Sequence, residues 1–302
     1  MPDWLKDDSV TQLGPLAQAL NILLTLCWLG GLPALIGLLL ASSSFRKKVC
    51  AFPPRPLPSF RFMDLLVTIV MFIGCQSVLV AGLLHAQSLL NLTNDKTGRV
   101  ALSMLGLLSM YALMLPVLVW LARRRGGPAG SAGFWPVHET LGMSPPRDIP
   151  FDVKAGIGTY ILMSWLTLAV FVLNKYLVYR LGWKADQNPM IEILVEELAG
   201  AKRFWLLAWL TFAATVGVAL FEELLFRGLL YNVFKRYAPT AVAAPLAALV
   251  FAGAHGVKSQ VLPLFVLGLL MTYAYERSGR LLAPIILHAT NNGLVMLILL
   301  CG

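Results

Sequence analysis

The stretch FEELLFRG, residues 221–228, places two glutamates and an arginine among leucine and phenylalanine side chains. The segment before it, FWLLAWLTFAATVGVAL, contains no charged residue. An ionisable side chain at the centre of a bilayer costs about 3 kcal/mol on insertion scales, so three of them close together need compensating partners. The stretch therefore predicts a membrane helix whose polar face has a function.

The composition predicts an all-α integral membrane protein. Of the 302 residues, 58% are hydrophobic and 13% are charged, whereas soluble domains carry roughly 25% charged residues. A membrane-spanning helix needs about 20 apolar residues. We expect about eight such helices around a central polar cavity, over residues 16–41, 62–84, 99–122, 153–179, 204–228, 239–257, 261–277 and 281–300.

The formal net charge of +9 reflects membrane orientation rather than a polyanionic partner. With the acidic N-terminus outside, most lysines and arginines fall on the inner side, as the positive-inside rule requires. We therefore expect an N-out, C-out topology and no nucleic-acid partner. The N-terminus lacks the basic region of a cleavable signal peptide, so we expect the first span to be retained.

The chain is not expected to divide into separately folding domains, although its chemistry is unevenly distributed. Residues 1–203 hold four spans, two basic loops and an amphipathic segment, 183–203, predicted to lie at the outer interface. Residues 204–302 hold helices five to eight and the polar motifs. His85 and His138 have no carboxylate pattern around them and are expected outside any site.

The spacing of the three ionisable groups in FEELLFRG predicts which two of them pair. Glu223 and Arg227 are spaced i,i+4, with the glutamate first, which favours an ion pair on one helix. This pair has a structural role, a catalytic role or both. Glu222 is rotated by about 100° from Glu223, so it needs another partner.

His255 is the predicted partner of Glu222. Ala238 and Pro239 mark a hairpin turn, and Glu222 and His255 lie at similar sequence distances on either side of it. In two antiparallel helices both residues reach about 25 Å from the turn, provided that the fifth helix continues through LLYNVFK.

The last span carries a second polar pair, His288 and Asn292, on one helix face. Counted from the turn near Gly279, they reach only about 14 and 20 Å, which is shallower than His255. We expect a tilt of this helix, or a break at Pro284, to close part of the difference.

Three motifs occur in order: Glu222-Glu223-x-x-x-Arg227, Phe251-x-x-x-His255 and His288-x-x-x-Asn292. They resemble those of the intramembrane CAAX protease and bacteriocin-processing family, the type II CAAX prenyl endopeptidases. The resemblance covers roughly residues 204–300, including Phe265-Val-Leu-Gly268, and it agrees with eight helices.

The resemblance implies an endopeptidase. Glu222 and His255 would activate a water molecule, while His288 and Asn292 would stabilise the tetrahedral intermediate. Glu223 joins this catalytic group, and Arg227 and Phe251 support it. The residue types suit these roles, because a carboxylate is a general base and N–H donors form an oxyanion site.

Two versions of this chemistry stay open. Glu222, His255 and His288 have the donor atoms of a catalytic zinc site, with Glu223 as a further ligand. The HExxH motif is absent, however, and the ion pair with Arg227 engages Glu223. A metal-free, glutamate-dependent mechanism is the slightly favoured alternative.

The expected partners are membrane lipids and a peptide or lipidated protein substrate: a prenylated CAAX peptide, a leader peptide or a membrane-bound segment. The resemblance implies a multi-pass protein of the bacterial inner membrane. The alternatives are a proton-coupled transporter, with Glu222 and the histidines as a proton relay, and a catalytically silent scaffold. The sequence predicts no oligomeric state.

Overall fold

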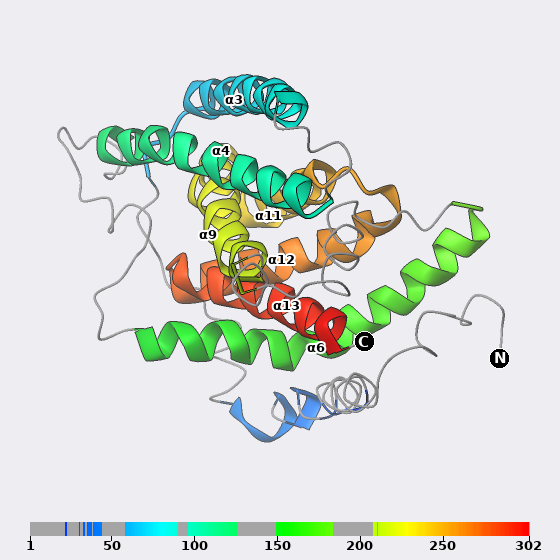
Figure 1. The fold of residues 1–302 in the computed structure, drawn as a ribbon. Coiled ribbons are helices and arrows are strands. Elements are labelled where there is room, and N and C mark those ends of the chain that lie inside the picture. The colour runs from blue at the N-terminus through cyan, green and yellow to red at the C-terminus, as the bar shows by residue number, and fades with distance from the viewer. Residues whose placement is uncertain are drawn as a thin grey trace.

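The computed structural model describes residues 58–89, 96–125, 149–183, 208–209 and 211–301, with isolated positions between 22 and 43. Almost all of these residues are helical, and this part of the chain contains no strand (Figure 1). The prediction of an all-α fold is confirmed here. Most of the span over 16–41 and of the amphipathic segment 183–203 lies outside the described residues.

Three long helices precede the polar motifs: α3 (Phe62–Leu89), α4 (Lys96–Arg125) and α6 (Ile149–Arg180). They match the spans predicted over 62–84, 99–122 and 153–179 and extend each by a few residues. Among the described helices, two are long and apolar enough to cross a membrane, over Phe62–Ala86 and Ile149–Arg180. Large apolar side chains are exposed along α3, as lipid contact requires: Met63, Val70, Val78 and Leu84.

The fifth predicted span is a continuous helical rod that changes its winding. It runs through η5 (Ala213–Gly217), α9 (Val218–Glu223), η6 (Leu224–Tyr231) and α10 (Asn232–Tyr237), of which η5 and η6 are π-helical. The continuation through LLYNVFK is therefore confirmed. Asn232 stabilises the wide turns, since its amide donates to the carbonyls of Arg227 and Gly228 at 3.0 and 2.8 Å.

The remaining helices form two more hairpins. They are α11 (Thr240–Ala254), the 3₁₀ turn η7 (Lys258–Gln260), α12 (Val261–Ser278) and α13 (Leu282–Cys301). Pro239, at φ −63° and ψ 156°, directly precedes α11, as the predicted turn requires. Gly256 follows α11 at φ 69°, a left-handed conformation that ends helices and favours glycine.

The helices pack around the rod that carries FEELLFRG. The C-terminal helix α13 contacts α6, α12, α9 and η5, and Figure 1 shows it lying along α6 and crossing the end of α9. The fully buried side chains at the centre include Tyr231, Phe251, Met271 and Leu287. The core therefore coincides with the part of the chain that carries the motifs.

Gly156 lets α6 and α13 approach closely. A Cβ atom at this position would lie 2.6 Å from the carbonyl oxygen of Ala283 and 3.0 Å from Cβ of Ile286. Because the first neighbour is backbone, it cannot move without shifting α13.

We predict that Gly156→Ala lowers stability by about 1–3 kcal/mol, the usual cost of overpacking. Thermal unfolding of the purified protein in nanodiscs measures the effect. Gly158→Ala on the same helix is the matched control, because a Cβ atom there meets nothing within 4 Å. Equal melting temperatures for the two variants would contradict this account of the helix crossing.

Candidate active site

The ion pair of FEELLFRG forms as its spacing predicts. Glu223 closes α9, and Arg227 lies in the following π-helix, η6. Arg227 Nη1 donates to Glu223 Oε1 at 2.8 Å, and the two side chains are 1% and 0% exposed. Two charges removed from solvent in this way hold each other in a fixed geometry, because neither has water as an alternative partner.

Arg227 also ties the rod to α11 and α12. Its Nη2 donates to the carbonyl oxygen of Gly268 at 2.9 Å, and its guanidinium lies 4.8 Å from the ring centre of Phe251. Gly268 is a close-approach position, since a Cβ atom there would lie 3.0 Å from Cβ of Ala248. The predicted Phe251 and Gly268 elements thus position the arginine.

His288 binds the same carboxylate from α13. Its Nδ1 lies 2.9 Å from Glu223 Oε1, and since a carboxylate oxygen accepts, Nδ1 carries the donated proton. The other ring nitrogen, Nε2, lies 3.9 Å from Glu222 Oε2. The fold therefore brings His288 to the Glu222 carboxylate that His255 also approaches, although helix counting placed His288 at a shallower depth. Pro284 lies in the first turn of an unbroken α13, so the expected break does not occur there.

His255 reaches Glu222 from the end of α11, as the hairpin geometry predicts. Its Nδ1 lies 2.8 Å from the carbonyl oxygen of Phe251, which can only accept, so Nδ1 is again the protonated nitrogen. Its Nε2 lies 3.9 Å from Glu222 Oε2. The Phe251 ring contacts both imidazoles edge to face, at 4.7 Å from His255 and 5.9 Å from His288.

Glu222 lies between the two imidazoles. Its Oε2 is buried and has no hydrogen-bond partner in the described part of the chain, although the side chain is 16% exposed. Within the same described residues, Oε2 of Glu223 and Nε of Arg227 are likewise buried without a hydrogen-bond partner. A neutral imidazole protonated at Nδ1 offers only a lone pair at Nε2. Glu222 Oε2 therefore requires a donor, and a water molecule or a protonated imidazole meets that requirement.

Asn292 lies one helical turn beyond His288 and contacts η5. Its Nδ2 donates to the carbonyl oxygen of Ala214 at 3.2 Å, and its Oδ1 accepts from Asn291 at 3.4 Å. An amide nitrogen carries two protons, so one N–H is not used by the bond to Ala214. Because α13 is helical throughout, His288 and Asn292 lie one turn apart on it, as the i,i+4 spacing predicts.

Tyr111 on α4 is a residue that the sequence analysis did not single out. It is buried, its ring stacks on Phe221 at 4.8 Å with an interplanar angle of 1°, and it interacts electrostatically with Glu222. Acids and histidines at mid-depth are the usual sequence signals of an intramembrane site, and a tyrosine is neither. A tyrosine inside an apolar helix was the available signal.

The donor atoms do not fit a zinc site in this arrangement. Among the described residues, no group of three or more His, Cys, Asp or Glu residues is placed to hold a metal ion. A zinc ligand must point its donor atom at the metal from about 2.0–2.2 Å. Glu223 Oε1 instead contacts Arg227 at 2.8 Å and His288 at 2.9 Å.

Comparison with known proteins supports the resemblance inferred from the motifs. Residues 204–294 match the family model described as type II CAAX prenyl endopeptidase Rce1-like. The chain is also similar to an uncharacterised 24.3 kDa protein of Escherichia coli, with 43% identity over 81 residues. That match covers 24% of this chain and 37% of the relative. No solved structure matches the chain.

The matched segment is the part of the chain that carries the cluster described above. It includes Glu222, Glu223, Arg227, Phe251, His255, His288 and Asn292. The protease resemblance is thereby confirmed for residues 204–294. Helices α3, α4 and α6 lie outside the match, so Tyr111 reaches the site from a region that the family model does not cover.

The ion pair gives a stability prediction. Arg227→Met leaves the buried Glu223 carboxylate without its guanidinium, and we expect a loss of about 3–5 kcal/mol. The double variant Arg227→Met, Glu223→Gln removes both charges, so we expect it to recover a substantial part of that loss. Unfolding in a graded series of SDS-containing micelles compares Arg227→Met, Glu223→Gln and the double variant with the wild type. Additive losses in the double variant would contradict the pairing.

Proposed function

We propose that the protein is an intramembrane endopeptidase that uses Glu222 as the general base for a water molecule. One observation carries the proposal: Glu222 Oε2, buried and without a partner in the described chain, lies 3.9 Å from Nε2 of both His255 and His288. A base needs a nearby proton and a fixed orientation. Here two imidazoles from different helices surround the carboxylate that would receive the proton.

Charge balance assigns the protons of the resting site. The two carboxylates and Arg227 alone leave one negative charge in a poorly solvated cluster, which is unfavourable. In the proposal a second proton on His288 balances this charge, since its Nδ1 already contacts Glu223 at 2.9 Å and its Nε2 faces Glu222 Oε2 at 3.9 Å. His255 stays neutral, so its Nε2 accepts a hydrogen bond from the attacking water.

In the first step, the water oxygen forms a bond to the carbonyl carbon of the scissile peptide. One water proton passes to Glu222, and the π-electrons of the carbonyl move to its oxygen. The negative charge thus leaves Glu222 and appears on the oxyanion. His288, carrying its second proton, and the remaining amide N–H of Asn292 stabilise this oxyanion, so the total charge of the site is unchanged during the attack.

In the second step, the carbonyl re-forms and the carbon–nitrogen bond breaks. Glu222 returns its proton to the leaving nitrogen, which departs as an amine, and the other product is a carboxylic acid. Glu223 and Arg227 keep their charges throughout. Their role in the proposal is to hold His288 in the required orientation.

The substrate class follows from the resemblance and from the apolar surroundings. We propose a peptide that reaches the site from the membrane, either a prenylated C-terminal peptide or another membrane-associated segment. The apolar exposed surface of α3 supports a location in the lipid bilayer, and we propose the bacterial inner membrane. Zinc dependence is the alternative mechanism that the test below includes.

We predict that Glu222→Gln lowers kcat by about 10²–10⁴-fold, because the amide cannot accept the water proton. The wild type and the variant are reconstituted in vesicles and offered farnesylated CAAX peptides and a panel of leader peptides, with products measured by mass spectrometry. His255→Ala is tested with His85→Ala as its matched control, because His85 is exposed on α3. We expect cleavage to be lost with the first histidine variant and kept with the second.

The same vesicles separate the competing functions. Proton or solute flux without cleavage of any peptide would replace the protease proposal by a transporter. Loss of cleavage with a chelator, and its recovery with added zinc, would replace the metal-free mechanism by a metal-dependent one. Full activity of Glu222→Gln would contradict the proposal that Glu222 is the general base.

Asn292 gives a separate prediction. Asn292→Ala removes one oxyanion donor, so we expect kcat to fall by about 10²–10³-fold with a smaller change in KM. The variant also loses the contact with Ala214, and thermal unfolding is measured alongside the kinetics. If activity falls only in proportion to the loss of folded protein, with kcat unchanged, Asn292 has a packing role instead.

A further inference from the structure

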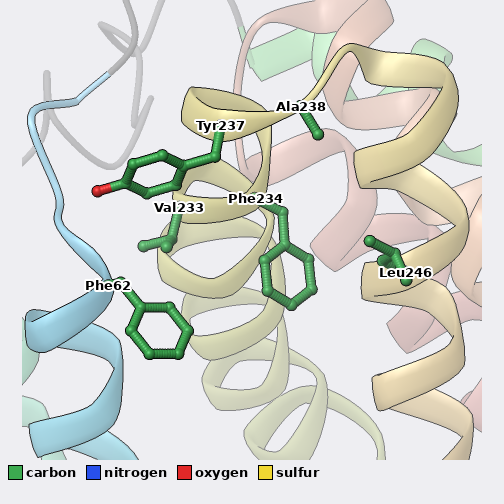
Figure 2. A pocket seen from close by; sticks show the side chains of 6 residues that line it. All are labelled: Phe62, Val233, Phe234, Tyr237, Ala238 and Leu246. Atoms are coloured by element: carbon green, nitrogen blue, oxygen red, sulfur yellow. The ribbon is translucent and has the colours of Figure 1, made fainter.

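A second feature lies at the hairpin turn, away from the glutamates. Six residues line a pocket of about 440 Å³: Phe62, Val233, Phe234, Tyr237, Ala238 and Leu246. Figure 2 shows them on the start of α3, on α10, at the turn and on α11, with the Phe234 ring between α10 and α11. We call this feature the Phe234 groove.

The groove is apolar and open. Phe62, Tyr237 and Leu246 are 56%, 65% and 45% exposed, whereas Val233 at its base is fully buried. Its volume is within the range of small-molecule sites, about 300–1,000 Å³. Exposed aromatic and aliphatic side chains around one concavity indicate an apolar ligand.

Two exposed arginines flank this apolar surface. Arg61 directly precedes Phe62, and Arg236 lies between Phe234 and Tyr237. Arg236 Nη1 donates to the carbonyl oxygen of Phe60 at 3.3 Å, which joins α10 to the segment before α3. A guanidinium has five N–H donors, so this bond leaves Arg236 with further capacity to bind an anion.

The charges around the groove have a positive balance. Lys235 pairs with Glu276, and Asp64 accepts from the main-chain N–H of Arg61 at 2.8 Å. The basic side chains near the groove, Arg61, Lys235 and Arg236, thus outnumber the acids Asp64 and Glu276 by one. The groove also lies at the end of the rod, about 17–24 Å along the helix from Glu222, where the turn and Tyr237 would meet the membrane interface.

We propose that the Phe234 groove binds an anionic phospholipid, with its acyl chain against the apolar lining and its phosphate on Arg61 and Arg236. Guanidinium groups suit phosphate because they donate parallel hydrogen bonds. Basic side chains at the inner surface of a membrane attract anionic lipids. This site is independent of the proposed peptidase chemistry.

Native mass spectrometry of the purified full-length protein tests the proposal. The protein is titrated with phosphatidylglycerol or phosphatidylcholine of the same chain length. We expect tighter binding of phosphatidylglycerol, with a loss of about fivefold for each arginine removed and about 25-fold for Arg61→Gln, Arg236→Gln. Leu246→Trp fills the apolar part and is expected to weaken both lipids.

Arg180→Gln is the matched control. Arg180 is an exposed arginine at the C-terminal end of α6, and that helix contacts η7 through Asn174 and Ser259, at the other end of α11. We expect this variant to bind both lipids as the wild type does. Equal binding of the two lipids to the wild type would overturn the proposal. Equal losses in Arg180→Gln and in the double variant would overturn it too.

Discussion

The buried carboxylate of Glu223 is the interaction on which the arrangement of the motif helices depends. One oxygen, Oε1, accepts from Arg227 on the same rod and from His288 on α13. Arg227 extends the contact to the Gly268 carbonyl on α12 and to the Phe251 ring on α11. Four consecutive segments of the chain are thus oriented around one acceptor. Because water is excluded from it, any shift of these helices would leave a charge without a partner.

The two glutamates have contrasting surroundings, although they are adjacent in sequence. Glu223 has strong partners and almost no exposure, whereas Glu222 Oε2 faces two imidazole nitrogens at 3.9 Å. The imidazoles are oriented by acceptors on their far sides, namely the Phe251 carbonyl and Glu223. This arrangement separates the group that holds the structure from the group available to react. In the proposed mechanism, this difference gives the two adjacent acids separate roles.

Spacing along the sequence was sufficient to predict local pairs and one hairpin. The Glu223–Arg227 pair and the approach of Glu222 to His255 follow from helical geometry and from a turn at Pro239. The position of His288 did not follow, because the crossing of α13 over α9 depends on side-chain packing between helices distant in sequence. Tyr111 escaped notice for a related reason: its stacking on Phe221 joins α4 to α9, and no periodicity along either helix encodes that contact.

The position of Tyr111 has a consequence for how such a protein diversifies. The residues that match a known family lie between 204 and 294, yet Tyr111 of α4, far upstream, packs beside the cluster by stacking on Phe221. Substitutions in the upstream helix can therefore change the surroundings of the ionisable groups while these groups keep their mutual distances.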